Sequence, residues 1–597
     1  MLAAVFVVVV AILGGPVPSV SLVGIAGAAG DSGLSTIPDG FLSAILHEMT
    51  LEEKVGQLFV TYAYGSAPDT VDIRNRVEFG VETPEQVVEK YHLGGIIYFN
   101  WTESVKDPKQ VAALSNGLQR AALSSGAHIP LMIATDQEQG IVARIGPPAT
   151  QFPGCMALGA GRGTDDAQRA AAITGSELRT MGVNQDLAPV SDVNSNPANP
   201  IIGVRSFGSE PELVARLVRA QVDGYQRSNV VTRTVSATAK HFPGHGDASQ
   251  DSHTTLPLID HTKRQWEQMD APPFQAAIDA GVDSIMTAHL EFPEIDPSGE
   301  PATLSPTIVT GLLRNELGYD GVVVTDALQM QGVRTLHNDA EIPVLALRAG
   351  VDELLMPQDL GLAITGVMTA LRNGQLTEER VDRSVTRVLR MKWRRGVFRA
   401  PLVDVNEVDG AVGTPQHLAA AQRVTDRTTT LVRNDAGLLP LTGEPKRVLV
   451  TGWGDSSTQA LAERIAVRGP DVGALPTGAT PTVSDIAVAV GAAKGVDLVI
   501  VLTNALSAHP EQQELLREMV AAGVPVVAVA VRNPYDVAYA ESETTWLATY
   551  SYTPVALESL SRVLFGEVRP RGKLPVNIPF ADDPTMTRFP FGYGLSW

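Results

Sequence analysis

Segment 239–257, AKHFPGHGDASQDSHTTLP, concentrates side chains that can transfer protons. Asp251 and His253 stand two positions apart in it, so the carboxylate can reach the imidazole within a tight loop. Such a contact would hold the imidazole in one tautomer. A pair of this kind can act first as a general acid and then as a general base. Glycines and a proline interrupt the segment, which predicts a loop rather than a helix or a strand and would let that loop move.

Two other interpretations of this segment stay open on spacing alone. Four of its side chains are possible metal ligands: His241, His245, Asp251 and His253. The H-x₃-H spacing lies in a Gly/Pro-containing loop, however, and not on one face of a helix. The histidines could also be purely structural loop residues.

Three further segments carry charged residues where apolar runs end. VVVTDALQM, residues 322–330, contains Asp326, which can be a nucleophile in a barrel mouth or only a helix N-cap. DQEQGIVAR, residues 136–144, contains Asp136 and Arg144, which can bind substrate hydroxyls or pair with each other. PIIGVRSFG, residues 200–208, adds an arginine, Arg205, in the loop after the fourth predicted strand.

These residues need a scaffold, and the pattern of apolar runs predicts one. Short apolar runs alternate with helical patterns, which indicates a parallel sheet covered on both faces. Eight such repeats favour a (β/α)₈ TIM-like barrel over an open doubly wound sheet. The predicted strands are 58–64, 94–100, 131–136, 186–193, 235–242, 284–292, 321–328 and 351–357.

Polar side chains recur where the predicted strands end. Barrel enzymes build their active sites at the carboxyl ends of their strands. The predicted barrel therefore brings these residues to one mouth: Asp136, Asp192, Lys240, His241, His289 and Asp326.

The remaining organisation follows from the same patterns. The barrel is predicted over residues 31–398, with a long amphipathic helix at its end, and residues 399–430 form a linker. Residues 431–597 again alternate apolar runs with helical patterns, which predicts a smaller α/β/α sandwich domain.

Residues 1–30 are an apolar run followed by small residues, which predicts a signal peptide or an N-terminal anchor. We therefore expect a secreted or cell-envelope-associated protein. Membrane contact is expected only through such an anchor.

Composition excludes one class of partner. The formal net charge is -20 and the sequence pI is about 5.0. Nucleic acid binding requires a basic surface, so no nucleic acid partner is expected.

The four charged segments, in this order, resemble glycoside hydrolase family 3, and specifically its β-N-acetylhexosaminidase branch. KHFPGHG (240–246) followed by DSH (251–253) is the most specific part of the resemblance. LVRNDAGLLPL (431–441) and the closing FPFGYGLSW (589–597) resemble the two-domain members. The resemblance runs from about residue 40 to the C-terminus.

The resemblance implies roles for individual residues. Asp326 matches the catalytic nucleophile, and His253 with Asp251 matches a His–Asp acid/base pair. Gln139 stands where the family commonly has a glycine, which affects the loop that holds Arg144. The residues that match the N-acetylglucosamine-binding positions are Asp136, Arg144, Arg205, Lys240 and His241.

The resemblance thus implies a retaining exo-β-N-acetylglucosaminidase that acts through a covalent glycosyl-aspartate. The expected partner is a carbohydrate, either peptidoglycan fragments or chitooligosaccharides, and the expected state is a monomer. No metal or organic cofactor is expected. The alternatives are a β-glucosidase or a glycoside phosphorylase of the same fold.

Overall fold

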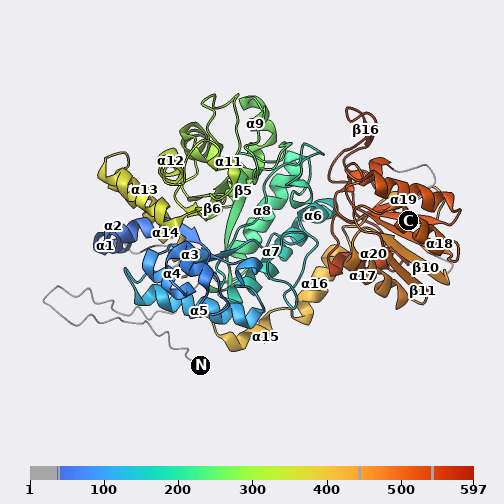
Figure 1. Ribbon diagram of the computed structural model, residues 1–597, viewed down its shortest axis with the longest axis horizontal. Coiled ribbons are helices and arrows are strands. Elements are labelled where there is room, and N and C mark those ends of the chain that lie inside the picture. The colour runs from blue at the N-terminus through green and yellow to red at the C-terminus, as the bar shows by residue number, and fades with distance from the viewer. Residues whose placement is uncertain (1–36, 38–39, 442–444, 540–543) are drawn as a thin grey trace.

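The computed structural model describes residue 37 and residues 40–441, 445–539 and 544–597. The predicted leader, residues 1–30, lies outside this described part. The chain forms two α/β domains, a larger one from blue to yellow and a smaller one in orange and red (Figure 1). Within the described ranges, no helix combines the length and the apolar character needed to cross a membrane.

The larger domain is a parallel eight-stranded sheet in the order β7-β6-β5-β4-β3-β2-β1-β8. It closes through a parallel bridge between Val324 and Glu353 and a hydrogen bond from Thr325 N to Glu353 O, 3.0 Å long. The predicted barrel is therefore confirmed. The strands are β1 (Phe59–Thr61), β2 (Gly95–Ile97), β3 (Met132–Thr135), β4 (Gln185–Asp186), β5 (Ser236–Phe242), β6 (Ser284–Thr287), β7 (Val322–Thr325) and β8 (Leu354–Leu355).

Helices surround the barrel and bury their apolar faces against it. Their starts follow from the sequence: at α4, for example, Thr83 caps the first turn and Pro84 occupies its first position. The helices are α1 (Phe41–Glu48), α2 (Leu51–Gly56), α3 (Ile73–Phe79), α4 (Pro84–Tyr91), α5 (Pro108–Ser124), α6 (Cys155–Gly161), α7 (Thr164–Thr180), α8 (Pro211–Arg227), α9 (Lys263–Met269), α10 (Ala271–Asp279), η6 (Thr307–Glu316), α11 (Gln331–Arg334), α12 (Ile342–Ala349), α13 (Leu360–Arg372) and α14 (Glu378–Arg394).

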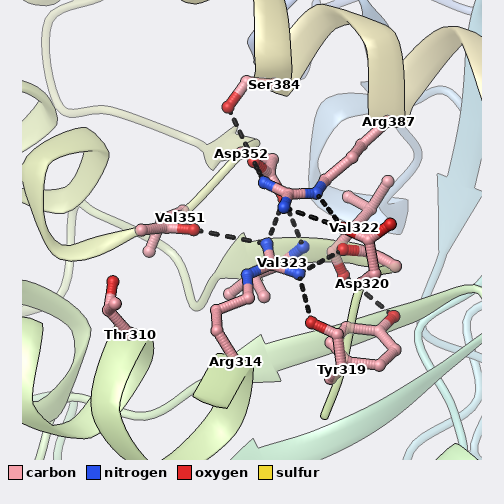
Figure 2. Close-up of polar contacts among 12 residues, drawn as sticks. Thr310, Arg314, Tyr319, Asp320, Val322, Val323, Val351, Asp352, Ser384 and Arg387 are labelled. Atoms are coloured by element: carbon pink, nitrogen blue, oxygen red, sulfur yellow. Dashed lines mark hydrogen bonds and ion pairs between the residues drawn. The ribbon is translucent and has the colours of Figure 1, made fainter. Parts of the chain in front are cut away.

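A buried carboxylate, Asp352, anchors the amino end of β8 where the barrel closes (Figure 2). Its oxygens accept hydrogen bonds from Ser384 Oγ at 2.7 Å and from the backbone N–H of Val323 at 3.1 Å. Arg387 lies 3.2 Å away, and Arg314 forms a second ion pair. Buried charges persist when they are paired and hydrogen-bonded in this way. The cluster ties α14 and η6 to the β7–β8 seam, at the end of the barrel opposite the polar mouth.

The strands are shorter than predicted, and the fourth differs most. Residues 186–193 were expected to form the fourth strand, but β4 contains only Gln185–Asp186. Pro189 has no N–H to donate to a ladder. Beyond it, the Asp192 side chain accepts hydrogen bonds from the backbone N–H groups of His241, near the end of β5, and of His245, just after β5. The chain beyond β4 nevertheless stays hydrogen-bonded to β5, from Thr238 N to Ala188 O at 2.8 Å and through a parallel bridge between Val190 and Lys240, and so runs beside β5 up to the barrel mouth.

The smaller domain is a six-stranded sheet in the order β11-β10-β12-β13-β14-β9, in which β9 is antiparallel to β14. Separate hydrophobic clusters lie on the sheet, which confirms the predicted sandwich. Its elements are β9 (Thr430–Arg433), β10 (Arg447–Gly452), β11 (Asp471–Pro476), β12 (Leu498–Thr503), β13 (Val526–Ala530), β14 (Thr545–Ala548), α17 (Asp455–Ala466), α18 (Val483–Ala493), α19 (Pro510–Ala521), α20 (Pro554–Leu564), β15 (Ile578–Pro579) and β16 (Thr587–Phe589).

The two domains pack directly on each other, with α15 (Val408–Ala411) and α16 (Pro415–Thr425) along the connection (Figure 1). Met156 and Val204 of the barrel domain join a hydrophobic cluster of the second domain. Asn194 Nδ2 donates to the Tyr535 hydroxyl at 2.9 Å. The loop that holds Arg205 is therefore supported from outside the barrel.

Candidate active site

A pocket of about 330 Å³ opens at the carboxyl ends of the barrel strands. Seven of the eight site residues predicted from the sequence line it, and the eighth, Asp251, contacts His253. The seven that line it are Asp136, Arg144, Arg205, Lys240, His241, His253 and Asp326.

Asp326 follows directly on β7, so the strand delivers its carboxylate to the pocket. Its backbone N–H donates to Thr287 O, and its Oδ1 accepts from the N–H of Ala327 at 2.7 Å. Burial by itself would raise the pKa of Asp326. The imidazoles of His241 and His289 outweigh it and hold that pKa below its usual value. The group is therefore an ionised carboxylate at neutral pH, as a nucleophile requires.

Opposite charges are paired around Lys240, at the end of β5. Its Nζ lies 2.9 Å from Asp136 Oδ1 and 2.7 Å from Glu138 Oε1, and its side chain is only 3% exposed. Burial would lower the pKa of Lys240, but Asp136 and Glu138 raise it. Arg144 reaches the second oxygen of Asp136 at 3.2 Å. The pairing keeps Lys240 charged and fixes the orientation of the Asp136 carboxylate at the pocket.

Glu138 is the central residue of this network, and sequence reasoning missed its role. Both of its oxygens accept hydrogen bonds from the Arg205 guanidinium at 2.8 Å, in addition to the contact with Lys240. Burial would raise the pKa of Glu138, but Arg205 and Lys240 hold it far below the ordinary value of 4.5. The sequence did contain one indication of this role, because Glu138 lies between Asp136 and Arg144, two residues that were predicted to bind substrate.

Replacing Glu138 by glutamine removes the carboxylate that pairs with the buried Arg205 and leaves Lys240 with Asp136 as its remaining ion-pair partner. We expect Glu138→Gln to lower the free energy of unfolding at pH 7 by about 3 kcal/mol or more. The folded-state pKa lies below that of the unfolded chain, so this stabilisation is fully present above pH 4.5 and is lost as the pH falls below it. Urea unfolding at pH 7 and at pH 3.5 measures the difference.

The exposed Glu89 provides the matched control, Glu89→Gln, which should leave the unfolding curve unchanged. A Glu138→Gln variant as stable as the wild type at pH 7 would show that the pairing does not stabilise the barrel.

Asp192 contacts two histidines, His241 near the end of β5 and His245 just after it. Its Oδ2 contacts His241 Nδ1 at 2.7 Å, and its Oδ1 accepts the backbone N–H groups of His241 and His245. Burial and the neighbouring His241 lower the pKa of His245 to about 4, so that imidazole is neutral. His245 Nε2 contacts Ser252 Oγ at 2.9 Å, which links the end of β5 to the start of the His253 turn.

His253 lies at the outer edge of the pocket, with its side chain 60% exposed. Its Nδ1 is 2.7 Å from Asp251 Oδ1, and the same oxygen accepts its backbone N–H. Nδ1 donates to the carboxylate in this arrangement, which leaves Nε2 to exchange a proton with a substrate. His253 O also accepts the N–H of Gln331 at 3.2 Å, so the turn is tied to the loop after Asp326.

The glycines of this loop are required by close packing. A Cβ at Gly246 would lie 1.6 Å from the carbonyl oxygen of Val193, and one at Gly244 would lie 2.6 Å from Asp270 Oδ1. His261 then joins the end of the loop to Asp270 at 2.7 Å. The sequence suggested glycines for loop movement, whereas these two let the loop base sit against the barrel.

Metal binding was the competing interpretation of this loop. In the described ranges, no three His, Cys, Asp or Glu side chains are grouped so as to hold a metal ion. His241 and His245 are instead joined to Asp192 and Ser252, and His253 is joined to Asp251. Each candidate ligand thus has a specific hydrogen-bonding partner.

Comparison with known proteins matches both domains to one family. The family model "Glycosyl hydrolase family 3 N terminal domain" matches residues 50–391, and "Glycosyl hydrolase family 3 C-terminal domain" matches residues 429–597. Beta-hexosaminidase A of Pseudoalteromonas piscicida is 36% identical over 436 residues, which cover 68% of this chain and 71% of that protein.

Two longer matches cover both domains. A beta-N-acetylglucosaminidase/beta-glucosidase of Cellulomonas fimi is 29% identical over 569 residues, covering 89% of this chain and 94% of that protein. The structure of a glycoside hydrolase family 3 beta-N-acetylglucosaminidase from Paenibacillus sp. str. FPU-7 superposes with a TM-score of 0.80 and 36% identity, covering 89% of this chain and 99% of that one. The resemblance inferred from the sequence is confirmed, and the chain belongs to glycoside hydrolase family 3.

Proposed function

We propose that this protein is a retaining exo-β-N-acetylglucosaminidase, with Asp326 as nucleophile and His253 as acid/base. The observation that carries the proposal is the His253–Asp251 contact of 2.7 Å, at the mouth of the pocket that Asp326 also lines. A nucleophile and a proton donor around one pocket are the two groups that double displacement needs.

In the first step the Asp326 carboxylate attacks the anomeric carbon of a bound terminal sugar. The bond from that carbon to the leaving oxygen breaks, and His253 donates its proton to this oxygen. Asp251 stabilises the imidazolium before transfer and holds its orientation afterwards. The products of the step are the free leaving group and a glycosyl ester on Asp326.

In the second step water replaces the leaving group. The now neutral His253 takes a proton from the water as its oxygen attacks the anomeric carbon. The ester bond breaks and Asp326 returns to its ionised form. Two inversions at one carbon give net retention. Through both steps Asp136, Lys240 and Arg144 provide the charged groups that hold the sugar hydroxyls.

The choice of N-acetylglucosamine rests on the relatives. The three proteins described above carry names that include hexosaminidase or N-acetylglucosaminidase activity. A β-glucosidase is the second candidate, because the Cellulomonas fimi relative is named for both activities. The apolar leader predicted from residues 1–30 supports export, and peptidoglycan fragments are then the substrate we propose outside the cytoplasm.

A two-substrate assay tests the sugar specificity. We expect kcat/KM for 4-nitrophenyl β-N-acetylglucosaminide to exceed that for 4-nitrophenyl β-glucoside at least about tenfold, the effect of one well-placed polar contact. The products in phosphate buffer should be free sugar. Faster cleavage of the glucoside would make the protein a β-glucosidase, and formation of sugar 1-phosphate would make it a phosphorylase.

A further inference from the structure

A tryptophan, Trp101, is presented at the pocket by a rigid turn after β2. Residues Asn100–Thr102 form a single 3-10 turn. Thr102 Oγ1 donates to Phe99 O at 2.8 Å, and Phe99 N donates to Ser104 Oγ at 3.0 Å. These local bonds close the turn on itself, so the backbone that carries the indole has a defined position.

Aromatic neighbours hold the indole in place. The Phe99 ring stacks on it with a centroid distance of 5.3 Å, and the Tyr62 and Tyr64 rings meet it at 4.7 and 5.8 Å in tilted, edge-type contacts. The hydroxyls of both tyrosines donate to the Glu78 carboxylate at 2.8 and 2.7 Å. A ring fixed in advance loses little conformational entropy when a ligand binds to it.

Despite this support, Trp101 is 48% exposed and lines the pocket. The chain has six tryptophans, all within the described ranges, and only Trp101 is largely exposed. Folding normally removes so large an apolar surface from water. An indole that is held in place by three aromatic side chains and still faces the pocket is suited to contact a ligand.

The position of Trp101 relative to the charged network indicates which part of the ligand it meets. Arg144 lies over the Phe99 ring at 5.4 Å, and Asn100 Nδ2 donates to Arg144 O at 2.9 Å, so the turn adjoins the sugar-binding charges. Lys240 is 3% exposed, whereas Trp101 and His253 stand at the exposed edge. The buried charged groups therefore bind the terminal sugar that Asp326 attacks, and the exposed edge of the pocket binds the leaving group.

We propose that Trp101 is the platform for the leaving group and that this group is a pyranose whose C–H-bearing face lies on the indole. The inference rests on the proposed function, because it needs a released sugar in the inner part of the pocket and a leaving oxygen near His253. It adds a preference: a substrate that continues into a second sugar ring is favoured over one that carries a simple alkyl group.

Two substrates, chitobiose and methyl β-N-acetylglucosaminide, both have alkoxide leaving groups, but only chitobiose has a second sugar ring. Comparing them distinguishes binding of that ring from an effect on bond cleavage. In Trp101→Ala we expect kcat/KM for chitobiose to fall roughly tenfold, the size of one lost aromatic contact, and that for the methyl glycoside to change less than about twofold. Trp101→Leu keeps apolar bulk against Phe99 without an aromatic face, so it should show the same selective loss. Trp101→Phe should recover most of the activity on chitobiose.

Phe580→Ala is the control for loss of an exposed aromatic ring, since Phe580 lies in the other domain and is 39% exposed. This variant should leave kcat/KM unchanged for both substrates. Equal losses on both substrates in Trp101→Leu, or no loss on chitobiose, would overturn the platform. Failure of the wild-type enzyme on every N-acetylglucosaminide would instead overturn the proposed function, so the two outcomes are distinguishable.

Discussion

The Asp326→Asn variant is expected to lose about 10⁴-fold or more in kcat on N-acetylglucosaminides, because an amide cannot form the glycosyl ester. The fold should be unaffected. Asp326 Oδ1 accepts one backbone hydrogen bond, from Ala327, and an asparagine oxygen can accept the same bond. Steady-state rates together with thermal unfolding of the same preparation measure both halves of this expectation.

Asp165 provides the matched substitution. It is exposed in the first turn of α7 and remote from the lining of the pocket, so Asp165→Asn should keep wild-type rates. An Asp326→Asn enzyme with undiminished kcat would mean that the carboxylate at the end of β7 is not the nucleophile.

The second large effect is expected for His253→Ala and depends on the leaving group. Loss of a general acid costs about 10²- to 10⁴-fold where the leaving oxygen must be protonated. An alkoxide, as in chitobiose, needs that proton, whereas 2,4-dinitrophenolate departs without it. We therefore expect a large fall in kcat/KM for chitobiose and a much smaller one for the dinitrophenyl glycoside.

His47→Ala is the control for this series, because His47 is exposed on α1. Equal losses on chitobiose and on the dinitrophenyl glycoside in His253→Ala would assign His253 to substrate positioning rather than to proton transfer.

The barrel could be predicted because eight apolar runs alternate with helical patterns and because charged or imidazole side chains stand toward the carboxyl ends of five of them. The extent of β4 could not, because the chain after Asp186 stays buried and keeps hydrogen bonds to β5, while Pro189, which has no N–H to donate, interrupts the regular ladder. Strands β9 and β11 were not predicted either. β11 is half-exposed and Gly-containing, and β9 pairs antiparallel at the opposite sheet edge.

The site shows the same division between local and long-range information. The positions of Asp326 and Lys240 follow from local pattern, since each stands where a strand ends. The role of Glu138 does not, because its partners Arg205 and Lys240 are brought to it only by folding. Gly246 is a second example: its close packing against Val193 forms only when the chain folds. The sequence therefore suggested that this glycine serves loop movement.

The central claim is that hydrolysis proceeds through a covalent sugar ester on Asp326. The most direct test uses 2,4-dinitrophenyl 5-fluoro-β-N-acetylglucosaminide, because its fluorine slows hydrolysis of the intermediate. The enzyme is incubated with this compound and its peptides are then analysed by mass spectrometry. We predict time-dependent inactivation and one added fluorosugar on the peptide that contains Asp326. Inactivation with the label on another residue, or turnover with no covalent adduct at all, would contradict the account.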